Sequence, residues 1–307
     1  MAAVTAALIK ELRDRTGAGM GDCKKALEAV GGDIDKAIEK LRTDGAVKAD
    51  KKAGRTAAEG IIAVAQNDSA VALVEVNSET DFVAKGEDFR ALAKAAAEAA
   101  LVHRPANAEA LGALKVGSQT LDERRRELVG KIGENLTIRR VAIVEAAGGP
   151  LVTYVHPGDK IAVALSMTSG DAQLARDLAM HAAAMAPRHV DAAGVPADVL
   201  ATEKRIIEAT VAEENAKAVA EGKPAKSADI QAKQVEGKLR KFVSEITLLG
   251  QAFVKNEAYG MKSDDAIEKV LKAKGSSVAH FARLAVGEGI EKKGGDFASE
   301  VDAIIKG

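Results

Sequence analysis

One pattern occurs twice in this chain and limits the folds open to it. Residues 61–76 (IIAVAQNDSAVALVEV) contain two apolar, β-branched stretches around a polar turn, and an alanine-rich helical stretch follows at 89–101. The same order of strand, strand and helix returns at 151–167 and 174–185. We therefore expect a degenerate internal repeat of two hairpin-plus-helix units, which places the chain in the α+β class.

The first copy contains an insertion that holds Phe82. Aligning the strands at Val71 and Val163 gives an offset of 92, whereas aligning the helices at Leu92 and Leu178 gives 86, so the first copy carries six additional residues around TDFVAK. The second copy does without them, which favours a binding loop with an accessible Phe82. The alternative is that Phe82 folds back into the core, where most phenylalanines are buried.

Three short apolar stripes precede the first copy and predict a small three-helix module over residues 1–45. Asp22 and Asp33 are expected to cap helices at their amino ends, and the glycines at 17–19 and 31–32 to end the preceding helices. Cys23 lies on the apolar side of the second helix and is expected in the core. The stripes are Leu8, Ile9 and Leu12; Cys23, Ala26, Leu27 and Val30; and Ile34, Ala37, Ile38 and Leu41.

The charge of the chain argues against a polyanion-binding protein. Its 44 basic and 45 acidic residues give a formal net charge of −1, so only a local patch could attract nucleic acid or a membrane surface. The one candidate is the run KADKKAGR at 48–55, which has no aromatic residue for base stacking and is interpreted as part of a solvated basic linker over 46–55. We expect neither a direct nucleic-acid partner nor a membrane partner.

The amino-terminal sequence and the cysteine content predict a cytoplasmic protein. Charged residues interrupt MAAVTAALIKELRDR too early for a signal peptide or a membrane span. Cys23 is the only cysteine, so no intramolecular disulfide can form.

A helical hairpin is predicted over residues 198–240. Apolar residues at 235, 239, 242, 246 and 249 alternate in steps of four and three, which is the spacing of a heptad seam. A weaker stripe at 200, 207, 211 and 218 precedes the breaker Gly222-Lys223-Pro224. The two helices could project as an antiparallel pair that dimerises, or both could pack on the core.

Enzymatic alternatives find little support in the motifs. The segment GAGMGD at 17–22 lacks the spacing of a nucleotide-binding glycine loop, and His181 within AMHAAAM is interpreted as a packed core histidine. No zinc-ligand spacing and no nucleophile motif occurs in the sequence. We therefore expect no catalytic residue, no cofactor and no metal site.

Several segments of the chain resemble one protein family. The stretch EVNSETDFVAK at 75–85 closely resembles the central signature of the bacterial elongation factor Ts family, and LRDRTGAGMGDCKKAL at 12–27 is similar to its amino-terminal signature. Residues 131–141, 241–254 and 286–301 also look like family segments. The resemblance implies a guanine nucleotide exchange factor for elongation factor Tu that makes and breaks no covalent bond.

The resemblance also implies which residues would touch the partner. Thr80, Asp81, Phe82 and Val83 would form the loop that inserts Phe82 between helices of the partner's G domain and disturbs its Mg²⁺ and phosphate binding. Secondary contacts would come from Arg13, Met20 and His156. The three-helix module would be similar to a ubiquitin-associated domain, and the hairpin would be a protruding coiled coil.

The expected domain layout follows from these patterns together. After the module and the linker come the first repeat at 56–147, including a helix from Asp122 and a strand at 136–144, the second repeat at 148–197, the inserted hairpin at 198–240, a return to the core at 241–279 and a small carboxyl-terminal helical module at 280–307. Two rival functions remain open. A plain interaction scaffold would leave nucleotide release unchanged, and a small-molecule enzyme would need a deep polar pocket.

Overall fold

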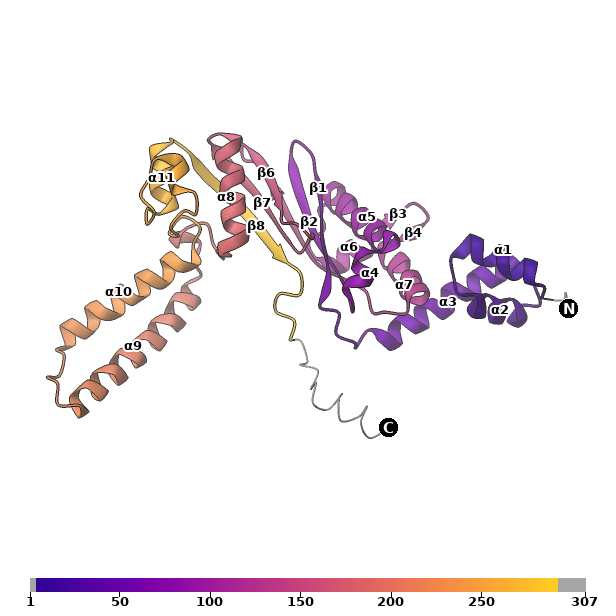
Figure 1. Cartoon of the computed structure of the whole chain (residues 1–307), viewed down its shortest axis with the longest axis horizontal. Coiled ribbons are helices and arrows are strands. Elements are labelled where there is room, and N and C mark those ends of the chain that lie inside the picture. Colours follow the sequence, from indigo (N-terminus) through magenta and orange to yellow (C-terminus); the bar gives the residue numbers. More distant parts are fainter. Residues whose placement is uncertain (1–3, 292–307) are drawn as a thin grey trace. The chain divides into compact units, whose positions relative to one another are not determined.

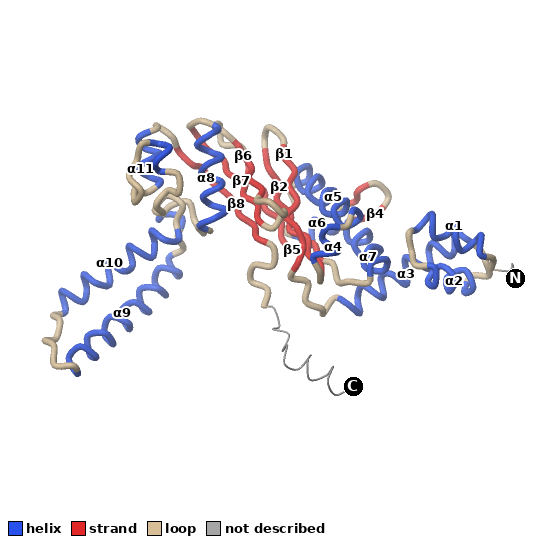
Figure 2. Tube along the Cα trace, viewed as in Figure 1, coloured by secondary structure: helices blue, strands red, loops and turns tan. Residues whose placement is uncertain are grey.

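The computed structural model describes residues 4–291 (Figure 1). The chain divides into two compact units. The first unit holds residues 4–143, 155–162 and 284–291 of the described chain, and the second holds 144–154 and 163–283. Both units combine helices with a small β-sheet, so the α+β class is confirmed (Figure 2).

The first unit begins with three helices, α1 (Ala6–Thr16), α2 (Met20–Ala29) and α3 (Ile34–Lys52). Asp33 caps α3 through its side chain, which accepts a hydrogen bond from the Lys36 amide at 3.1 Å. The prediction that Asp22 caps the second helix is wrong: α2 begins at Met20 after Gly19, which leaves Asp22 in the first turn, where a carboxylate stabilises the helix dipole. Cys23 is buried among apolar side chains of all three helices, as predicted.

The basic segment at 46–55 is mostly helix and not an extended linker. α3 continues without interruption to Lys52, and Ala49 is buried on it. The helix extends this far because it packs along α7 (Leu121–Ile132), and most helical stability in proteins comes from such tertiary packing. The predicted boundary at residue 45 therefore falls inside a continuous helix.

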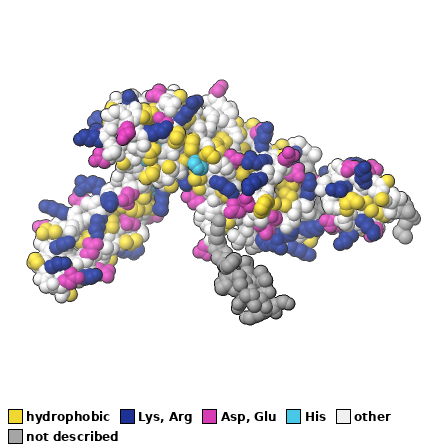
Figure 3. Space-filling view, in the orientation of Figure 1, with side chains coloured by type: hydrophobic (Ala, Val, Ile, Leu, Met, Phe, Trp, Pro, Cys, Tyr) yellow, Lys and Arg dark blue, Asp and Glu magenta, His cyan; other side chains and the backbone are white. Residues whose placement is uncertain are grey.

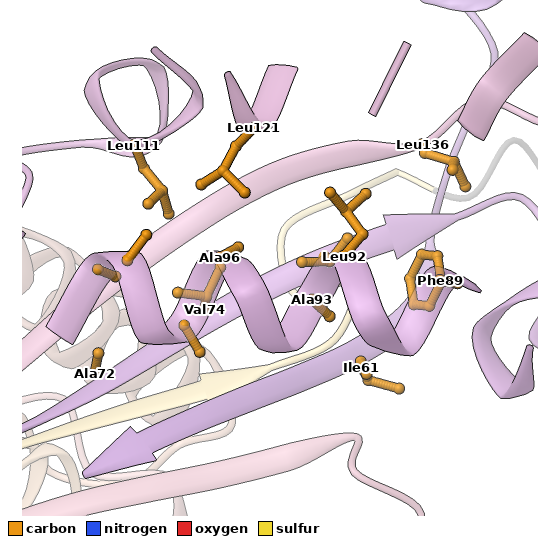
Figure 4. Packing of buried hydrophobic residues seen from close by; sticks show 14 of the residues in the cluster. Ile61, Ala72, Val74, Phe89, Leu92, Ala93, Ala96, Leu111, Leu121 and Leu136 are labelled. Atoms are coloured by element: carbon orange, nitrogen blue, oxygen red, sulfur yellow. The ribbon is translucent and has the colours of Figure 1, made fainter. Parts of the chain in front are cut away.

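A three-stranded sheet of order β1-β2-β5 follows, formed by β1 (Glu59–Gln66), β2 (Ala70–Ser78) and β5 (Thr137–Glu145). β1 and β2 are antiparallel, with Ile61 opposite Val76. α5 (Glu87–His103) covers the sheet, and Figure 4 shows Phe89, Leu92, Ala93 and Ala96 of this helix among the strand side chains. Its many alanines allow the helix to approach the sheet closely.

Short elements connect α5 to the third strand. They are the helix α6 (Ala108–Gly112), a small ladder of β3 (Lys115–Val116) with β4 (Gln119–Thr120), and then α7. A capping box at Thr120 and Glu123 starts α7 one residue before the predicted Asp122. Leu111, Leu121 and Leu136 from these connections are fully buried and complete the core around α5 (Figure 4).

A second sheet has the order β6-β7-β8, formed by β6 (Leu151–Val155), β7 (Ile161–Ser169) and β8 (Ser277–Ala285). The helix α8 (Ala172–Met185) follows β7, so strand, strand and helix occur here in the same order as in the first sheet. Homology between the two segments stays a prediction. His181 of α8 is fully buried, and its Nε2 lies 2.8 Å from the Gln251 side-chain oxygen, in agreement with the predicted core role.

The predicted hairpin is formed by α9 (Ala197–Ala220) and α10 (Ala228–Ile246), which lie side by side in Figure 1. The second helix runs six residues past the expected end at 240. Ile207 and Val211 of α9 are buried, and Val211 lies beside Val235 and Leu239 of α10. Leu249, the last position of the expected seam, lies beyond α10. Self-association through this hairpin stays a prediction.

The chain after α10 contains two 3₁₀ or α-helical elements, Asn256–Tyr259 and α11 (Ile267–Ala273), and then enters β8; a further 3₁₀ turn, Ala192–Gly194, precedes α9. The carboxyl-terminal module predicted from residue 280 begins too early, because 280–285 belong to the sheet strand β8. The remainder of that prediction, residues 292–307, lies outside the described residues. No helix within residues 4–291 is long and apolar enough to cross a bilayer.

Candidate partner-binding site

Phe82 is the most exposed large hydrophobic side chain in the described part of the chain, with 81% of its surface open to solvent. It lies on α4 (Asp81–Lys85), a single helical turn between β2 and α5. Most phenylalanines are substantially buried, so an exposed one on an ordered element is a candidate for contact with a partner. The prediction that Phe82 is accessible is confirmed.

The turn that carries Phe82 is helical, although the sequence predicted an irregular loop. Thr80 has extended backbone angles and acts as the amino-terminal cap, because its Oγ1 accepts a hydrogen bond from the Val83 amide at 3.4 Å. Gly86 ends the turn with a bond from its amide to the Val83 carbonyl at 2.9 Å and also starts α5. Residues 80–86 therefore fold into a compact turn.

The neighbours of Phe82 on the turn fix the direction of its side chain. Ala84 is buried, and Val83 is half-buried and packs against the core cluster beneath α5. Successive side chains on a helix point about 100° apart, so anchoring Val83 and Ala84 in the core turns Phe82 outward. The exposure of Phe82 thus follows from the packing of the residues after it.

Opposite charges flank the exposed ring. The Lys85 Nζ donates to the Asp81 carboxylate at 2.6 Å and lies 5.7 Å from the centre of the Phe82 ring. The hydrogen bond from Lys85 lowers the pKa of Asp81, so this carboxylate is ionised at neutral pH. A partner would therefore meet an apolar ring bordered by one anion and one cation.

A distant segment of the chain is hydrogen-bonded to the turn. Glu134, between α7 and β5, accepts hydrogen bonds from the Thr80 amide at 3.0 Å and from the Thr80 hydroxyl at 2.7 Å. In return, Glu79 accepts a hydrogen bond from the Asn135 amide at 2.6 Å. Sequence reasoning missed both partners, because they lie more than 50 residues away from the turn. The only local signal is a polar pair directly before an apolar strand.

The predicted secondary residues lie on other elements. Arg13 is exposed on α1, Met20 is 50% exposed at the first position of α2, and His156 is exposed in the turn between β6 and β7. The structure therefore brings together Thr80, Asp81, Phe82 and Val83, whereas the other three residues lie on other elements. Basic and acidic side chains are intermixed on the face in Figure 3, in keeping with the near-zero net charge.

A cleft of about 320 Å³ lies between the three-helix module and α7. Two of its charged side chains are paired, with the Lys48 Nζ 2.9 Å from the Asp22 carboxylate, and neither histidine nor cysteine is among its lining residues. Within residues 4–291, no group of three histidine, cysteine, aspartate or glutamate side chains is arranged to hold a metal ion.

Comparisons with known proteins agree on one family. A family model described as Elongation factor TS matches residues 79–288. Proteins named Elongation factor Ts are similar over nearly their whole length: that of Xanthomonas oryzae pv. oryzae (strain PXO99A) is 50% identical over 299 residues, which make up 97% of each chain, and that of Methylococcus capsulatus is 47% identical over 307 residues, or 99% of each. The matched range includes the Phe82 turn and Glu134.

Proposed function

The chain belongs to the elongation factor Ts family and is a translation elongation factor, and we propose that it binds elongation factor Tu carrying GDP and speeds the release of that nucleotide. The observation that carries the proposal is Phe82, which is 81% exposed on an anchored helical turn. Removal of a large apolar ring from water by a partner makes the free energy of binding more favourable. This turn is therefore our choice for the main contact.

The exchange step needs no covalent chemistry. If this protein and GDP weaken each other's hold on elongation factor Tu, the coupling between the two binding sites is reciprocal. Binding of the protein then expels GDP, and binding of a new nucleotide expels the protein. The family is one of exchange factors and not of catalysts of covalent reactions.

The target of the turn would be the Mg²⁺ and phosphate site of the partner. Mg²⁺ demands near-ideal octahedral coordination, so small displacements of its surroundings weaken its binding and that of the nucleotide phosphates. We propose that Phe82 inserts between helices of the G domain while Asp81 and Lys85 meet polar groups at the edge. Thr80 and Val83 would keep the turn in shape, through the cap and the core contact respectively.

Three further residues are proposed as secondary contacts. Met20 is half-exposed and has the flexible apolar side chain that suits an adaptable interface. Arg13 and His156 are exposed polar residues on other elements. We expect their substitution to alter the affinity for elongation factor Tu less than substitution of Phe82, because binding energy concentrates in central aromatic anchors.

Release of a fluorescent GDP from elongation factor Tu, followed by stopped flow in excess Mg²⁺, tests the proposal. The release rate should rise with the concentration of this protein and then saturate. Binding to elongation factor Tu without faster GDP release would rule out the exchange function and favour an interaction scaffold. A scaffold that self-associates through α9 and α10 would in addition sediment as a dimer at micromolar concentration.

A further inference from the structure

We propose that Glu134 is a positioning residue for exchange: it holds Thr80 so that the Phe82 turn is formed before the partner arrives. The proposal rests on the proposed exchange function and adds to it a residue outside the turn. Glu134 follows α7 and reaches the turn across 54 positions of sequence. It would act through Thr80, without touching the partner itself.

The geometry of the contact explains how Glu134 would act. One carboxylate oxygen accepts from the Thr80 hydroxyl at 2.7 Å and the other from the Thr80 amide at 3.0 Å. Because the Thr80 hydroxyl donates its hydrogen bond to Glu134, its oxygen is free to accept one. The Val83 amide donates to this oxygen at 3.4 Å. The carboxylate thereby fixes both the rotamer of Thr80 and the cap that starts α4.

The support for Glu134 is itself anchored. The next residue, Asn135, is buried and donates its amide to Glu79 at 2.6 Å and its side-chain nitrogen to the Arg55 carbonyl at 2.8 Å. Each glutamate thus accepts from the backbone of the opposite segment, Glu134 from Thr80 and Glu79 from Asn135. This exchange of bonds joins the two segments at adjacent positions.

The same segment is also tied to the end of the three-helix module. The Lys52 Nζ at the carboxyl end of α3 donates to the Gly133 carbonyl, and the Asn135 side chain lies within 3.4 Å of the Ala53 carbonyl. Residues 133–135 are therefore hydrogen-bonded both to the end of α3 and to the Phe82 turn. A shift of Glu134 would therefore affect both the Phe82 turn and the contacts at the end of α3.

The short length of α4 explains why the turn would need the hydrogen bonds between Thr80 and Glu134. A helix of five residues is not stable in isolation, because forming the first turn fixes several dihedral angles for a single hydrogen bond. If the turn is formed for only a fraction of the time, the apparent affinity for the partner falls by that fraction. Loss of these hydrogen bonds should therefore raise the concentration of this protein needed for half-maximal exchange. The saturated rate should change much less.

The chain contains no tryptophan, which gives a direct probe of the turn. The variant Phe82→Trp places a single indole at the exposed position, and its time-resolved fluorescence anisotropy reports local motion on the nanosecond scale. In this background, Glu134→Gln and Thr80→Val should increase the amplitude of the fast decay, and Thr80→Ser, which keeps the hydroxyl, should not. An unchanged fast decay in Glu134→Gln would overturn the proposal.

Two controls separate positioning from general loss of structure. Glu98→Gln removes an exposed carboxylate on α5 and should leave the indole at position 82 unchanged. A second single-tryptophan variant, Val102→Trp, places the probe at another exposed site, 69% open to solvent on the same helix, and Glu134→Gln should not alter its decay. A fast decay that grows equally at both probes would show a global effect and overturn the positioning role.

The exchange assay then tests the functional consequence with the native Phe82. We expect Glu134→Gln to raise the half-saturating concentration about tenfold and to leave the saturated rate within about twofold, the result for a turn formed about a tenth of the time. An unchanged half-saturating concentration would overturn the proposal. If the wild-type protein fails to accelerate release, the proposed exchange function fails, and the anisotropy result alone decides whether Glu134 positions the turn.

Discussion

Gly45 of α3 and Gly130 of α7 face each other where the two helices cross, so closely that a Cβ atom added to Gly130 would lie 2.8 Å from the Gly45 Cα. No real Cβ makes so short a contact with a backbone atom. Glycine lacks a Cβ and permits this approach, at the cost of helix propensity. The crossing packs the last helix of the three-helix module against α7, within the first unit.

The variant Gly130→Ala should therefore destabilise the protein. Helix propensity alone would favour the alanine by about 1 kcal/mol. The overlap with Gly45 must be relieved by moving α3, and overpacking of this kind costs about 1–3 kcal/mol. We expect a lower midpoint of thermal unfolding, measured by circular dichroism.

Gly237→Ala is the matched control, since Gly237 lies inside α10 with nothing within 4 Å of an added Cβ. It should gain about 0.5–1 kcal/mol of stability. Gly45→Ala should fall between the two, because its added Cβ would lie 3.6 Å from the nearest atom, an ordinary contact. Equal stabilisation by Gly130→Ala and Gly237→Ala would contradict the close crossing.

The variant Phe82→Ala should lose exchange activity and keep its fold. The ring buries little surface in the free protein, so the free energy of unfolding should change by less than about 0.5 kcal/mol. Truncation of an aromatic anchor costs about 2 kcal/mol or more in an interface. At about 1.4 kcal/mol per tenfold change, this predicts a loss of at least about tenfold in the second-order rate constant of GDP release.

Val102→Ala is the control for this prediction, because Val102 is also exposed and apolar but lies near the far end of α5. Its release rate should match that of the wild type. Full activity of Phe82→Ala would move the main contact to another surface, and equal losses in both variants would indicate a general effect of exposed apolar area.

The sequence predicted those features that depend on local pattern. The six additional residues of the first copy indicated that Phe82 is not needed for the core, and its exposure agrees with that. The heptad spacing likewise predicted the paired helices α9 and α10. In both cases the signal is a spacing that can be read directly along the chain.

Features that depend on distant partners were missed. α3 extends past residue 45 because α7 packs along it, and the pattern within α3 carries no sign of α7. The cap at Thr80 was hidden for the same reason, since Glu134 orders a polar stretch that otherwise has the composition of a loop. Residues 280–285 were assigned to a separate module because a strand at the end of a chain shows its pairing only in the folded sheet.

His181 should make the stability of the second unit depend on pH near neutrality. Burial lowers the pKa of His181, and the hydrogen bond with Gln251 opposes this only in part. Its Nε2 faces the Gln251 oxygen at 2.8 Å, and its Nδ1 accepts from the Val254 amide at 3.4 Å, an arrangement that suits the neutral ring. The unfolded chain therefore takes up the proton first as the pH falls.

The sign follows from that order of protonation. The free energy of unfolding should decrease as the pH falls below the usual histidine value of about 6.5, until the folded protein also takes up the proton. Urea unfolding of wild type and His181→Asn at pH 7.5 and 5.5 should show a smaller difference between the two pH values in the variant. His103→Asn, at an exposed position of α5, should behave as the wild type.

Glu75 predicts a second pH dependence, in the acid range. Its side chain is fully buried on β2, and it accepts hydrogen bonds from Arg139, Arg140, Asn77 and the Gly287 amide, the last at 2.8 Å. Burial by itself raises the pKa of Glu75, but the bonds from Gly287, Arg140 and Asn77 outweigh it and lower the pKa below its usual 4.5.

A carboxyl group whose pKa is lowered by folding stabilises the folded state at neutral pH, and this contribution disappears as the pH falls from about 4.5 through the pKa of the folded protein. Removal of the carboxylate leaves two partly buried guanidinium groups without it, which costs about 3 kcal/mol for a buried pair. Glu75→Ala should therefore be destabilised at pH 7, and its deficit relative to the wild type should shrink at pH 3.

The same carboxylate ties the end of the described chain to the first sheet, so its loss should also be visible there. The Arg139 side chain donates to the Glu288 carbonyl at 2.7 Å, and the Arg140 side chain donates to the Ala285 carbonyl at 2.5 Å. With Glu75 absent, the two arginines are no longer held toward this segment, and the Gly287 amide loses its acceptor. Amide hydrogen exchange at 285–288 should therefore quicken in Glu75→Ala at pH 7. Unchanged amide hydrogen exchange at 285–288, together with a lower free energy of unfolding, would show that Glu75 stabilises the first sheet only. That result would contradict its proposed role in holding residues 285–288.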